Sequence, residues 1–353
     1  MRHILICSLA LLINVNQYVL LDQTKCNTVS FNKPFQLSSS CFQVYNTKFK
    51  SIIGVWLPQT NSILFTSNRQ GDLNTSNQWI DIYTINLYDG RVKNITGELT
   101  RLNGHRHLMA NGGTGNYNRK SILLCSQGYR SNGGSIIEIT HDFNRLVPII
   151  TQYNNLSLNS PNDVIISDKD QSIWFTDPQY GFMQNFRYGQ PQLDNNVYRF
   201  DINGNIQILI NDLVRPNGVA FNSEETILYV TESGYALGNG SINSQVPRAI
   251  YSYQIYRQRY KNIYLYNKRL LTHVQPGIPD GIKVDQNGYL YVGCGDGVQI
   301  FDDNGALLGK IILPNSKSGV AGLVLAGKKL VMLAETEIWT VDLRCHKCKT
   351  TLL

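Results

Sequence analysis

Charged residues are scarce in this chain: Asp, Glu, Lys and Arg together make up only 16% of its 353 residues. No long stretch shows the three-to-four-residue apolar spacing of a helix, and beyond residue 21 no segment is apolar for long enough to cross a bilayer. Tyr, Gly, Asn and Ser are plentiful instead, a mixture typical of short strands and tight turns. The modest net charge of +7 identifies no polyanionic partner, and we expect no binding to nucleic acid.

The amino terminus has the pattern of a secretory signal. A short basic start precedes the apolar run Ile4–Ile13, which matches the core of a signal peptide and is too short to span a bilayer. We therefore assign residues 1–25 to a signal peptide with an uncertain cleavage site, and residues 26–353 to a single domain. We expect a secreted protein with no membrane attachment after cleavage. An uncleaved anchor, extended by Tyr18–Leu21, is the alternative because no clear cleavage motif follows.

Two further features favour an oxidising compartment. Four glycosylation motifs occur in segments expected to be loops, at Asn74, Asn94, Asn155 and Asn239. Six cysteines follow the leader: Cys26, Cys41, Cys125, Cys294, Cys345 and Cys348. Two lie near each end of the mature chain, where a disulfide would close a circular fold. The Cys345–Cys348 spacing also permits a redox or half-zinc motif, whereas the two central cysteines lie in strand-like runs and are expected to be buried, inert thiols.

A repeated motif sets the predicted fold. Each copy consists of a turn, a strand, an Asn/Asp/Gly turn and a second strand, as in Pro161–Val164 followed by Ile173–Asp177, and two further strands usually follow. Other copies begin at Ile53, Met109, Arg215, Ile278 and Gly319. Four strands in each of six repeats predict a six-bladed β-propeller, whereas the repeats of a solenoid are shorter and more regular. The strand-like segment Cys41–Tyr45 ahead of the first repeat is expected to complete the last blade.

Three repeats carry an oxygen ligand at the same position. Asn162, Asn217 and Asp280 each follow a Pro that fixes the turn before an inner strand, so the fold directs all three towards one mouth of the central channel. Amide and carboxylate oxygens suit a hard cation, and Ca²⁺ is favoured over Zn²⁺ because no His or Cys accompanies them. Asn and Asp also initiate turns routinely, but three in phase around one axis favour the metal site.

These motifs resemble those of the senescence-marker-protein/gluconolactonase/lactonase family, and Ala110–Gly113 is similar to its fungal lactonohydrolase branch. The resemblance covers about Ile53 to Leu343 and is carried by Ser160–Asp163, Phe175–Gly181, Arg215–Gly218, Pro279–Asp285 and Gly295–Val298. It implies a six-bladed propeller that holds one divalent cation, usually Ca²⁺, and hydrolyses lactones or related esters. Asn162, Asn217 and Asp280 match the metal-site positions of the family.

One departure from the family pattern concerns its first metal ligand, a Glu at the start of blade one. Ile52 lies nearest to that place, and no acidic residue occurs from Gln23 to Gly71. Because calcium affinity depends on ligand charge, the loss of one of two carboxylates is expected to weaken binding. Replacement by an acid at the end of a second strand is the open alternative, and the candidates are Asp177, Glu232, Asp296 and Glu335.

The expected mechanism follows from the metal. The cation acts as a Lewis acid on a lactone carbonyl while a carboxylate or a metal-bound water attacks, and Asp280 is predicted to be the catalytic ligand and base or nucleophile. His105, His107 and His273 are further candidates for a general base, although each stands alone in a context typical of surface or structural histidines.

A secreted, monomeric calcium-dependent lactone (ester) hydrolase acting on a small molecule is therefore the favoured hypothesis. The alternative is a catalytically degenerate propeller that binds a ligand or partner at the same mouth, because the family's Glu is absent. Tyrosines alternating with basic residues in Tyr251–Leu270 permit a glycan or polyanion surface, but they are more simply explained as the outer strand pair of blade four.

Overall fold

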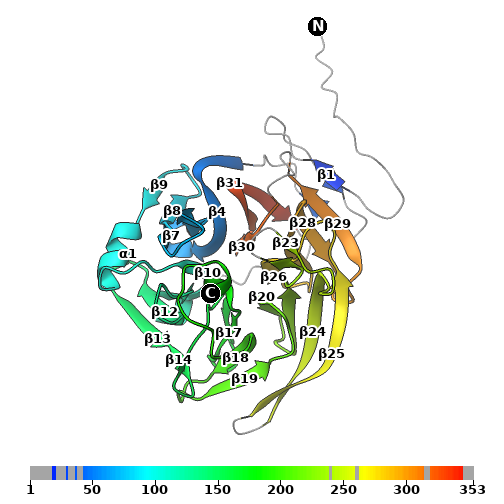
Figure 1. The fold of residues 1–353 in the computed structure, drawn as a ribbon. Coiled ribbons are helices and arrows are strands. Elements are labelled where there is room, and N and C mark those ends of the chain that lie inside the picture. Colours follow the sequence, from blue (N-terminus) through cyan, green and yellow to red (C-terminus); the bar gives the residue numbers. More distant parts are fainter. Residues whose placement is uncertain are drawn as a thin grey trace.

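Six blades built of antiparallel strands follow one another around a central axis in this computed structural model (Figure 1). The structure describes residues 43–237, 241–258, 262–313 and 319–344, with side chains described from Ile53 onward, together with the short strands β1 (Tyr18–Leu20), β2 (Val29–Ser30) and β3 (Gln36–Leu37). The predicted six-bladed β-propeller is confirmed. No described helix is long and apolar enough to span a membrane.

The strands of each blade run outward from the axis in chain order. Blade one consists of the end of β4 (Gln43–Leu57), β5 (Ser62–Ser67), β8 (Ile82–Asn86) and β9 (Val92–Asn94). Blade two consists of β10 (Ala110–Asn116), β11 (Ser121–Ser126), β12 (Ser135–Thr140) and β13 (Leu146–Ile150). Blade three consists of β16 (Val164–Ile166), β17 (Ile173–Asp177), β18 (Asn196–Phe200) and β19 (Ile206–Ile210).

The second half of the ring repeats this order. Blade four consists of β20 (Pro216–Phe221), β21 (Ile227–Glu232), β24 (Ala249–Arg257) and β25 (Ile263–His273), so Tyr251–Leu270 belongs to the outer strand pair as expected. Blade five consists of β26 (Ile282–Val284), β27 (Leu290–Cys294), β28 (Gly297–Phe301) and β29 (Leu307–Ile312), and β1 pairs in parallel with β29. Blade six begins with β30 (Gly322–Ala326) and β31 (Lys329–Arg344).

Small elements decorate the connections. They are the helices α1 (Thr96–Leu102) and α2 (Tyr180–Met183), the 3-10 turns η1 (Pro58–Thr60) and η2 (Tyr117–Arg119), and the hairpins β6 (Gln70–Gly71) with β7 (Gln78–Trp79), β14 (Gln152–Tyr153) with β15 (Leu156–Ser157), and β22 (Ala236–Leu237) with β23 (Ser241–Ile242). Connections from a second to a third strand, and from a fourth strand to the next blade, lie on the same face of the ring. That face therefore carries the starts of the inner strands together with the two helices and the three hairpins, whereas η1 and η2 connect a first strand to a second and lie on the other face.

The last blade is completed by the amino-terminal part of β4. β31 folds back on itself, because the Leu343 amide donates to the Lys328 carbonyl at 2.6 Å and Lys329 pairs with Asp342 at 2.9 Å. The outer half of β31 then pairs antiparallel with Gln43–Asn46. β4 continues from there into blade one, which confirms the predicted closure of the ring from Gln43 onward, while Cys41 and Phe42 lie outside the described residues.

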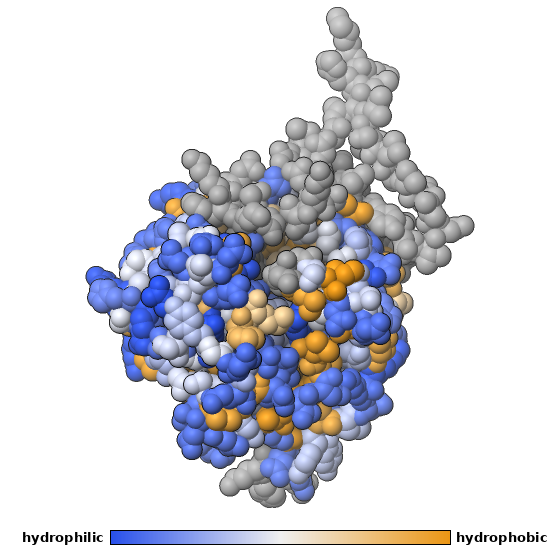
Figure 2. All heavy atoms as spheres, in the orientation of Figure 1, coloured by the Kyte–Doolittle hydropathy of each residue, from blue (hydrophilic) through white to orange (hydrophobic). Residues whose placement is uncertain are grey.

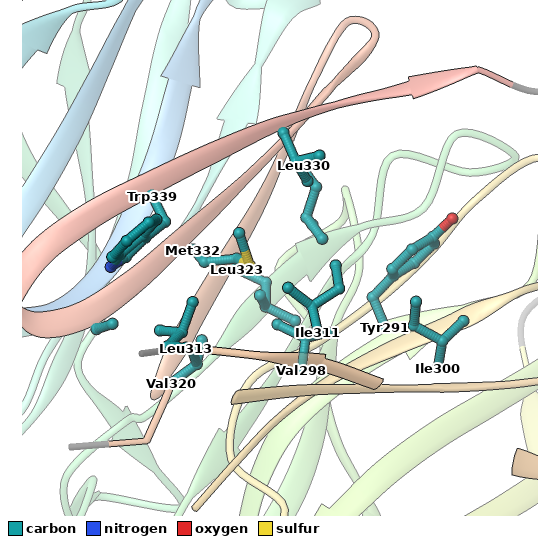
Figure 3. Close-up of a cluster of buried hydrophobic side chains, with 12 residues drawn as sticks. Tyr291, Val298, Ile300, Ile311, Leu313, Val320, Leu323, Leu330, Met332 and Trp339 are labelled. Carbon is teal, nitrogen blue, oxygen red and sulfur yellow. The ribbon is translucent and has the colours of Figure 1, made fainter. Parts of the chain in front are cut away.

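Apolar residues form one cluster at each contact between successive blades. β31 shows why the sequence produces this arrangement. Leu330 and Met332 pack against blade five (Figure 3), whereas the alternate residues Val331 and Leu333 pack against blade one. Successive side chains of a strand point to opposite faces, and an inner strand is buried on both, so its sequence is a continuous apolar run. Each blade is therefore held by its two neighbours, and the ring is closed by hydrophobic contact as well as by β4.

Cys125 in β11 and Cys294 in β27 are buried and free, as expected. Asn74 and Asn155 lie exposed in turns, while Asn94 ends β9 rather than lying in a loop, although it too is exposed. The remaining cysteines, the leader before Tyr18 and the motif at Asn239 lie outside the described residues.

Candidate functional site

The three predicted ligand residues meet at one mouth of the central channel. Asn162 precedes β16, Asn217 lies in β20 and Asp280 precedes β26, so each begins the inner strand of blade three, four or five. All three line a pocket of about 250 Å³ and also a cavity of about 20 Å³ directly beneath it. Asn162 and Asn217 are buried, and Asp280 is half-buried. The predicted convergence is therefore present in the structure, while the metal-binding and catalytic roles remain predictions.

Threonine hydroxyls connect these three positions across the blade boundaries. The Thr176 hydroxyl accepts a hydrogen bond from the Asp163 amide at 3.1 Å and donates to the Asn217 carbonyl of the next blade at 2.7 Å. Thr231 repeats the arrangement: it accepts from the Gly218 amide and donates to the Asp280 carbonyl, both at 2.7 Å. These buried bonds join each ligand turn to the next one around the ring.

The donor set suits a hard cation. The Asn162 Oδ1 atom is buried and has no hydrogen-bond partner, so a site for a positive charge is the simplest explanation of its orientation. The pKa of Asp280 is raised to about 7, chiefly because the carboxyl is buried; a hydrogen bond from Asn217 lowers this pKa and the nearby Asp163 raises it. No three His, Cys, Asp or Glu side chains gather as a metal-ligand cluster among the described residues. The set is thus one carboxylate and two amides, a ligand type typical of Ca²⁺ rather than Zn²⁺.

The position of the missing Glu is occupied by an apolar segment. Ile53 lines the small cavity beneath the three ligand residues, and the side chain of Ile52 lies outside the described ones. The cavity therefore holds no acid from blade one among the side chains that the structure describes.

Three of the four proposed replacement acids are engaged elsewhere. Glu232 accepts hydrogen bonds from the amides of Val214, Arg215 and Gly234 at 2.7–2.8 Å, and thereby fixes two connections. Asp296 pairs with Lys310 at 2.8 Å.

Asp177 is fully buried and accepts from the Asn159 amide at 2.8 Å. None of these three acids lines the pocket or the cavity, and the side chain of Glu335 lies outside the described residues. Glu232 and Asp296 are engaged by backbone amides and by Lys310, and Asp177 is buried without lining the pocket or the cavity, so the structure offers no replacement ligand among these three.

A carboxylate that sequence reasoning missed does line the small cavity. Asp163 follows Asn162 directly, and its carboxylate accepts from the Val219 amide at 3.2 Å and lies 3.8 Å from the Lys283 ammonium. The matching positions in the next two repeats are Gly218 and Gly281, which leave room for this side chain at the axis. The contrast between Asp and Gly at one repeat position is the signal that could have identified it.

The three candidate histidines do not line the pocket. His105 and His273 are exposed, and the ring of His107 packs edge-on against Tyr129 at 5.4 Å. These placements agree with the surface or structural interpretation and leave Asp280 as the candidate base.

The outer pocket is polar. Its lining includes amide, hydroxyl and guanidinium groups from strand β10 and three further connections: Asn68, Arg69, Asn111, Gln127, Tyr180 and Gln184. The Asn111 Oδ1 atom is buried without a partner, as is that of Asn162. Figure 2 shows the uncovered part of the face seen in Figure 1 as largely hydrophilic, with hydrophobic residues gathered near the middle. Such a pocket can orient a small polar molecule above the three ligand residues.

Sequence comparison assigns the fold to a family. The family model described as the SMP-30/gluconolactonase/LRE-like region matches residues 74–336, which is more than half of the chain. The chain belongs to the SMP-30/gluconolactonase/LRE-like family. It is 30% identical over 164 residues to a gluconolactonase of Zymomonas mobilis (46% of this chain and 44% of that protein). It is 28% identical over 205 residues to a lactonohydrolase of Aspergillus oryzae (55% and 44%).

The chain thus matches less than half the length of these two curated relatives. Among solved structures, a gluconolactonase from Xanthomonas campestris superposes with a TM-score of 0.69 at 24% identity, covering 90% of this chain and 94% of that one. Regucalcin from Agrobacterium tumefaciens, a calcium-binding protein, superposes with a TM-score of 0.56 at 10% identity, covering 85% and 92%. These likenesses establish the fold that this family member shares with solved propellers.

Replacement of Thr231 by Val tests the connection between the ligand turns. The valine leaves the Gly218 amide and the Asp280 carbonyl unpaired at a buried site, so we expect the free energy of unfolding to fall by about 1–3 kcal/mol. Thr231→Ser keeps the hydroxyl and is expected to lose less. Urea denaturation of both variants measures the difference, and a Val variant as stable as the Ser variant would contradict the role of the hydroxyl.

Asp177 predicts a pH dependence of stability in this family member. Burial raises its pKa to about 7, against about 4 in an unfolded chain. Between those values the folded protein keeps the proton that the unfolded chain loses, so the free energy of unfolding is expected to fall as pH rises from about 4 to 7.

Asp177→Asn removes this contribution while keeping the oxygen that accepts from Asn159. Urea denaturation at several pH values within that window is expected to give a flatter profile for the variant. Identical slopes for the two proteins would show that Asp177 ionises normally.

Proposed function

We propose that this protein is a calcium-dependent hydrolase of lactones or related esters. The observation that carries the proposal is the convergence of Asn162, Asn217 and Asp280 at the floor of a polar pocket, in a chain of the gluconolactonase family. The names of its curated relatives, a gluconolactonase and lactonohydrolases, support a cyclic ester as the substrate. The calcium-binding regucalcin, which shares the fold, is consistent with Ca²⁺ as the ion.

Each residue of the site has a distinct task in this reaction. Asn162 and Asn217 would hold the cation through neutral oxygens, and Asp280 through its carboxylate; bound there, Ca²⁺ would supply Lewis-acid polarisation of the substrate carbonyl. Asp280 is half-exposed to the pocket, where a carboxylate oxygen can accept a proton from the attacking water. The Asn111 amide faces the same pocket and can orient the ring of the substrate.

We also propose that the mature protein acts outside the cell. The apolar leader at Ile4–Ile13 and the exposed glycosylation motifs at Asn74, Asn94 and Asn155 support this location.

A binding module without catalysis is the second candidate function. The family resemblance places a Glu close to Ile53, which lines the cavity in this protein. The site therefore has one carboxylate fewer to hold the ion. In that case the pocket would bind a small polar molecule without turnover, and a chelator would leave the binding unchanged.

A lactone panel with and without chelator distinguishes the two functions. We expect hydrolysis that is abolished by EDTA and restored by Ca²⁺, and a loss of about 10²-fold or more in kcat/KM for Asp280→Asn, because the variant lacks both the ligand charge and the base. Asp303→Asn removes one carboxylate from the exposed turn between β28 and β29 and is the matched control, with unchanged activity. Turnover that is indifferent to both EDTA and Asp280→Asn would refute the metal-dependent mechanism.

A further inference from the structure

Arg69 lies in the wall of the outer pocket without a carboxylate to neutralise it. It sits on the connection between β5 and β6 and is half-buried. Its Nη1 atom donates to the Gln78 side-chain oxygen at 2.8 Å and to the Gln184 carbonyl at 3.3 Å, and both acceptors are neutral. No acidic side chain among the described residues pairs with it. A guanidinium stays protonated and positively charged in proteins.

Two other partly buried arginines differ in this respect, whereas Arg187 and Arg215 resemble Arg69 in donating to carbonyls without a carboxylate partner in the described chain but do not line the pocket. Arg199 and Arg257 both contact the Asp170 carboxylate, at 3.1 and 3.0 Å, and Arg257 also contacts Glu225 at 2.8 Å. A partly desolvated charge is costly when it is unpaired. Arg69 therefore has the character of a group whose partner arrives with a ligand.

The arginine is held firmly in place. Gln78 is fully buried, and its side-chain amide donates to the carbonyls of Thr75 at 2.6 Å and Gln184 at 2.8 Å while its oxygen receives Arg69. Gln184 follows α2 in blade three, so this contact ties the β6–β7 hairpin of blade one to the β17–β18 connection of blade three. The Nε and Nη2 atoms have no partner in the described part of the chain, and these two N–H groups match the two oxygens of a carboxylate.

The charges of the pocket lining set the charge of the ligand. Arg69 and Asp280 are the two charged residues among the described ones that line it, and the rest are amide, hydroxyl or apolar. Asp280 is required at the floor for the cation, which leaves Arg69 as the free charge of the wall. A substrate with one negative group at the end remote from its reacting carbonyl would match both ends of the pocket.

We propose that Arg69 forms a carboxylate-binding subsite, and that the preferred substrate is a small lactone or ester bearing a carboxylate. The inference of a carboxylate-binding subsite rests on Arg69 and its neighbours, whereas the choice of a lactone as substrate rests on the proposed function. Hydrolysis breaks the acyl C–O bond of the ring: the oxygen of water becomes part of a new carboxylate, and the ring oxygen leaves as a hydroxyl with a proton. The product is then a hydroxy-dicarboxylate, which also fits Arg69 through its original carboxylate.

A matched pair of substrates tests the subsite. We expect γ-butyrolactone carrying a carboxylate next to the ring oxygen to exceed its neutral carboxamide analogue by about tenfold or more in kcat/KM, the effect of one charge-assisted contact. Arg69→Gln is expected to reduce that ratio to about one, chiefly by lowering kcat/KM for the charged lactone, and Arg69→Lys to retain an intermediate ratio. Arg106→Gln removes an exposed positive charge from the β9–β10 connection outside the pocket lining, and is expected to keep the wild-type ratio.

A binding measurement separates this inference from the proposed function. Calorimetric titration with 2-hydroxyglutarate, the product of the charged lactone, is expected to show binding to the wild-type protein that Arg69→Gln loses and Arg106→Gln keeps. If that pattern appears although neither lactone is hydrolysed, the subsite stands and the hydrolase proposal falls. A wild-type ratio near one, or an Arg69→Gln variant that binds and discriminates as the wild type does, would overturn the subsite, and circular dichroism of each variant verifies folding.

Discussion

A threonine hydroxyl shared between neighbouring blades is the contact on which the candidate site depends. Thr176 and Thr231 each accept an amide hydrogen bond from their own blade and donate to the carbonyl of the next ligand residue. Asn162, Asn217 and Asp280 thus belong to one hydrogen-bonded chain rather than to three independent loops. The apolar clusters between blades are strong but non-directional, so these directional hydrogen bonds help to fix the separation of the three candidate ligand residues.

Close approach of the inner strands makes this chain possible. The Gly112 amide donates to the Asn162 carbonyl at 2.6 Å, and a Cβ at Gly112 would lie 2.2 Å from that oxygen. A Cβ at Gly218 would similarly lie 2.5 Å from the Asp280 carbonyl oxygen. The glycines of the Asn-Gly and Asp-Gly motifs are therefore needed for the contact between blades, and the site gains its rigidity from backbone packed against backbone.

The site contains few charged residues, and this affects how it would bind a cation and a substrate. The floor has one carboxylate and two amides, Asp163 beneath it is balanced by Lys283, and Arg69 provides a cation in the wall. A divalent ion held by so few charges would keep much of its Lewis acidity but bind less tightly than in sites rich in carboxylates. Arg69 is the one positively charged residue in the described lining of the pocket, so it is the group expected to bind the anionic part of a substrate.

The repeat pattern predicted both the fold and the three ligand positions, because Pro and the turn fix where an inner strand begins. It also contains a signal for Asp163, an Asp where the next two repeats have Gly, but the direction of that side chain depends on strand parity that sequence alone leaves open. Strand parity also left open where Asp177, Glu232 and Asp296 point. In the structure Asp177 and Glu232 accept hydrogen bonds from backbone amides, and Asp296 pairs with Lys310. The role of Arg69 could not be predicted from the sequence, because one of the residues that hold it, Gln184, lies 115 residues later in the chain.

Calorimetric titration of Ca²⁺ into the purified protein tests the central claim, that these three connected residues hold one cation without the family's Glu. We predict saturable binding with a Kd of about 10⁻⁶ to 10⁻³ M, within the range of protein calcium sites. Asn217→Ala and Asp280→Ala are each predicted to abolish it, while Asp303→Asn binds as the wild type does. Absence of binding at millimolar Ca²⁺, or binding that survives both alanine variants, would contradict the account.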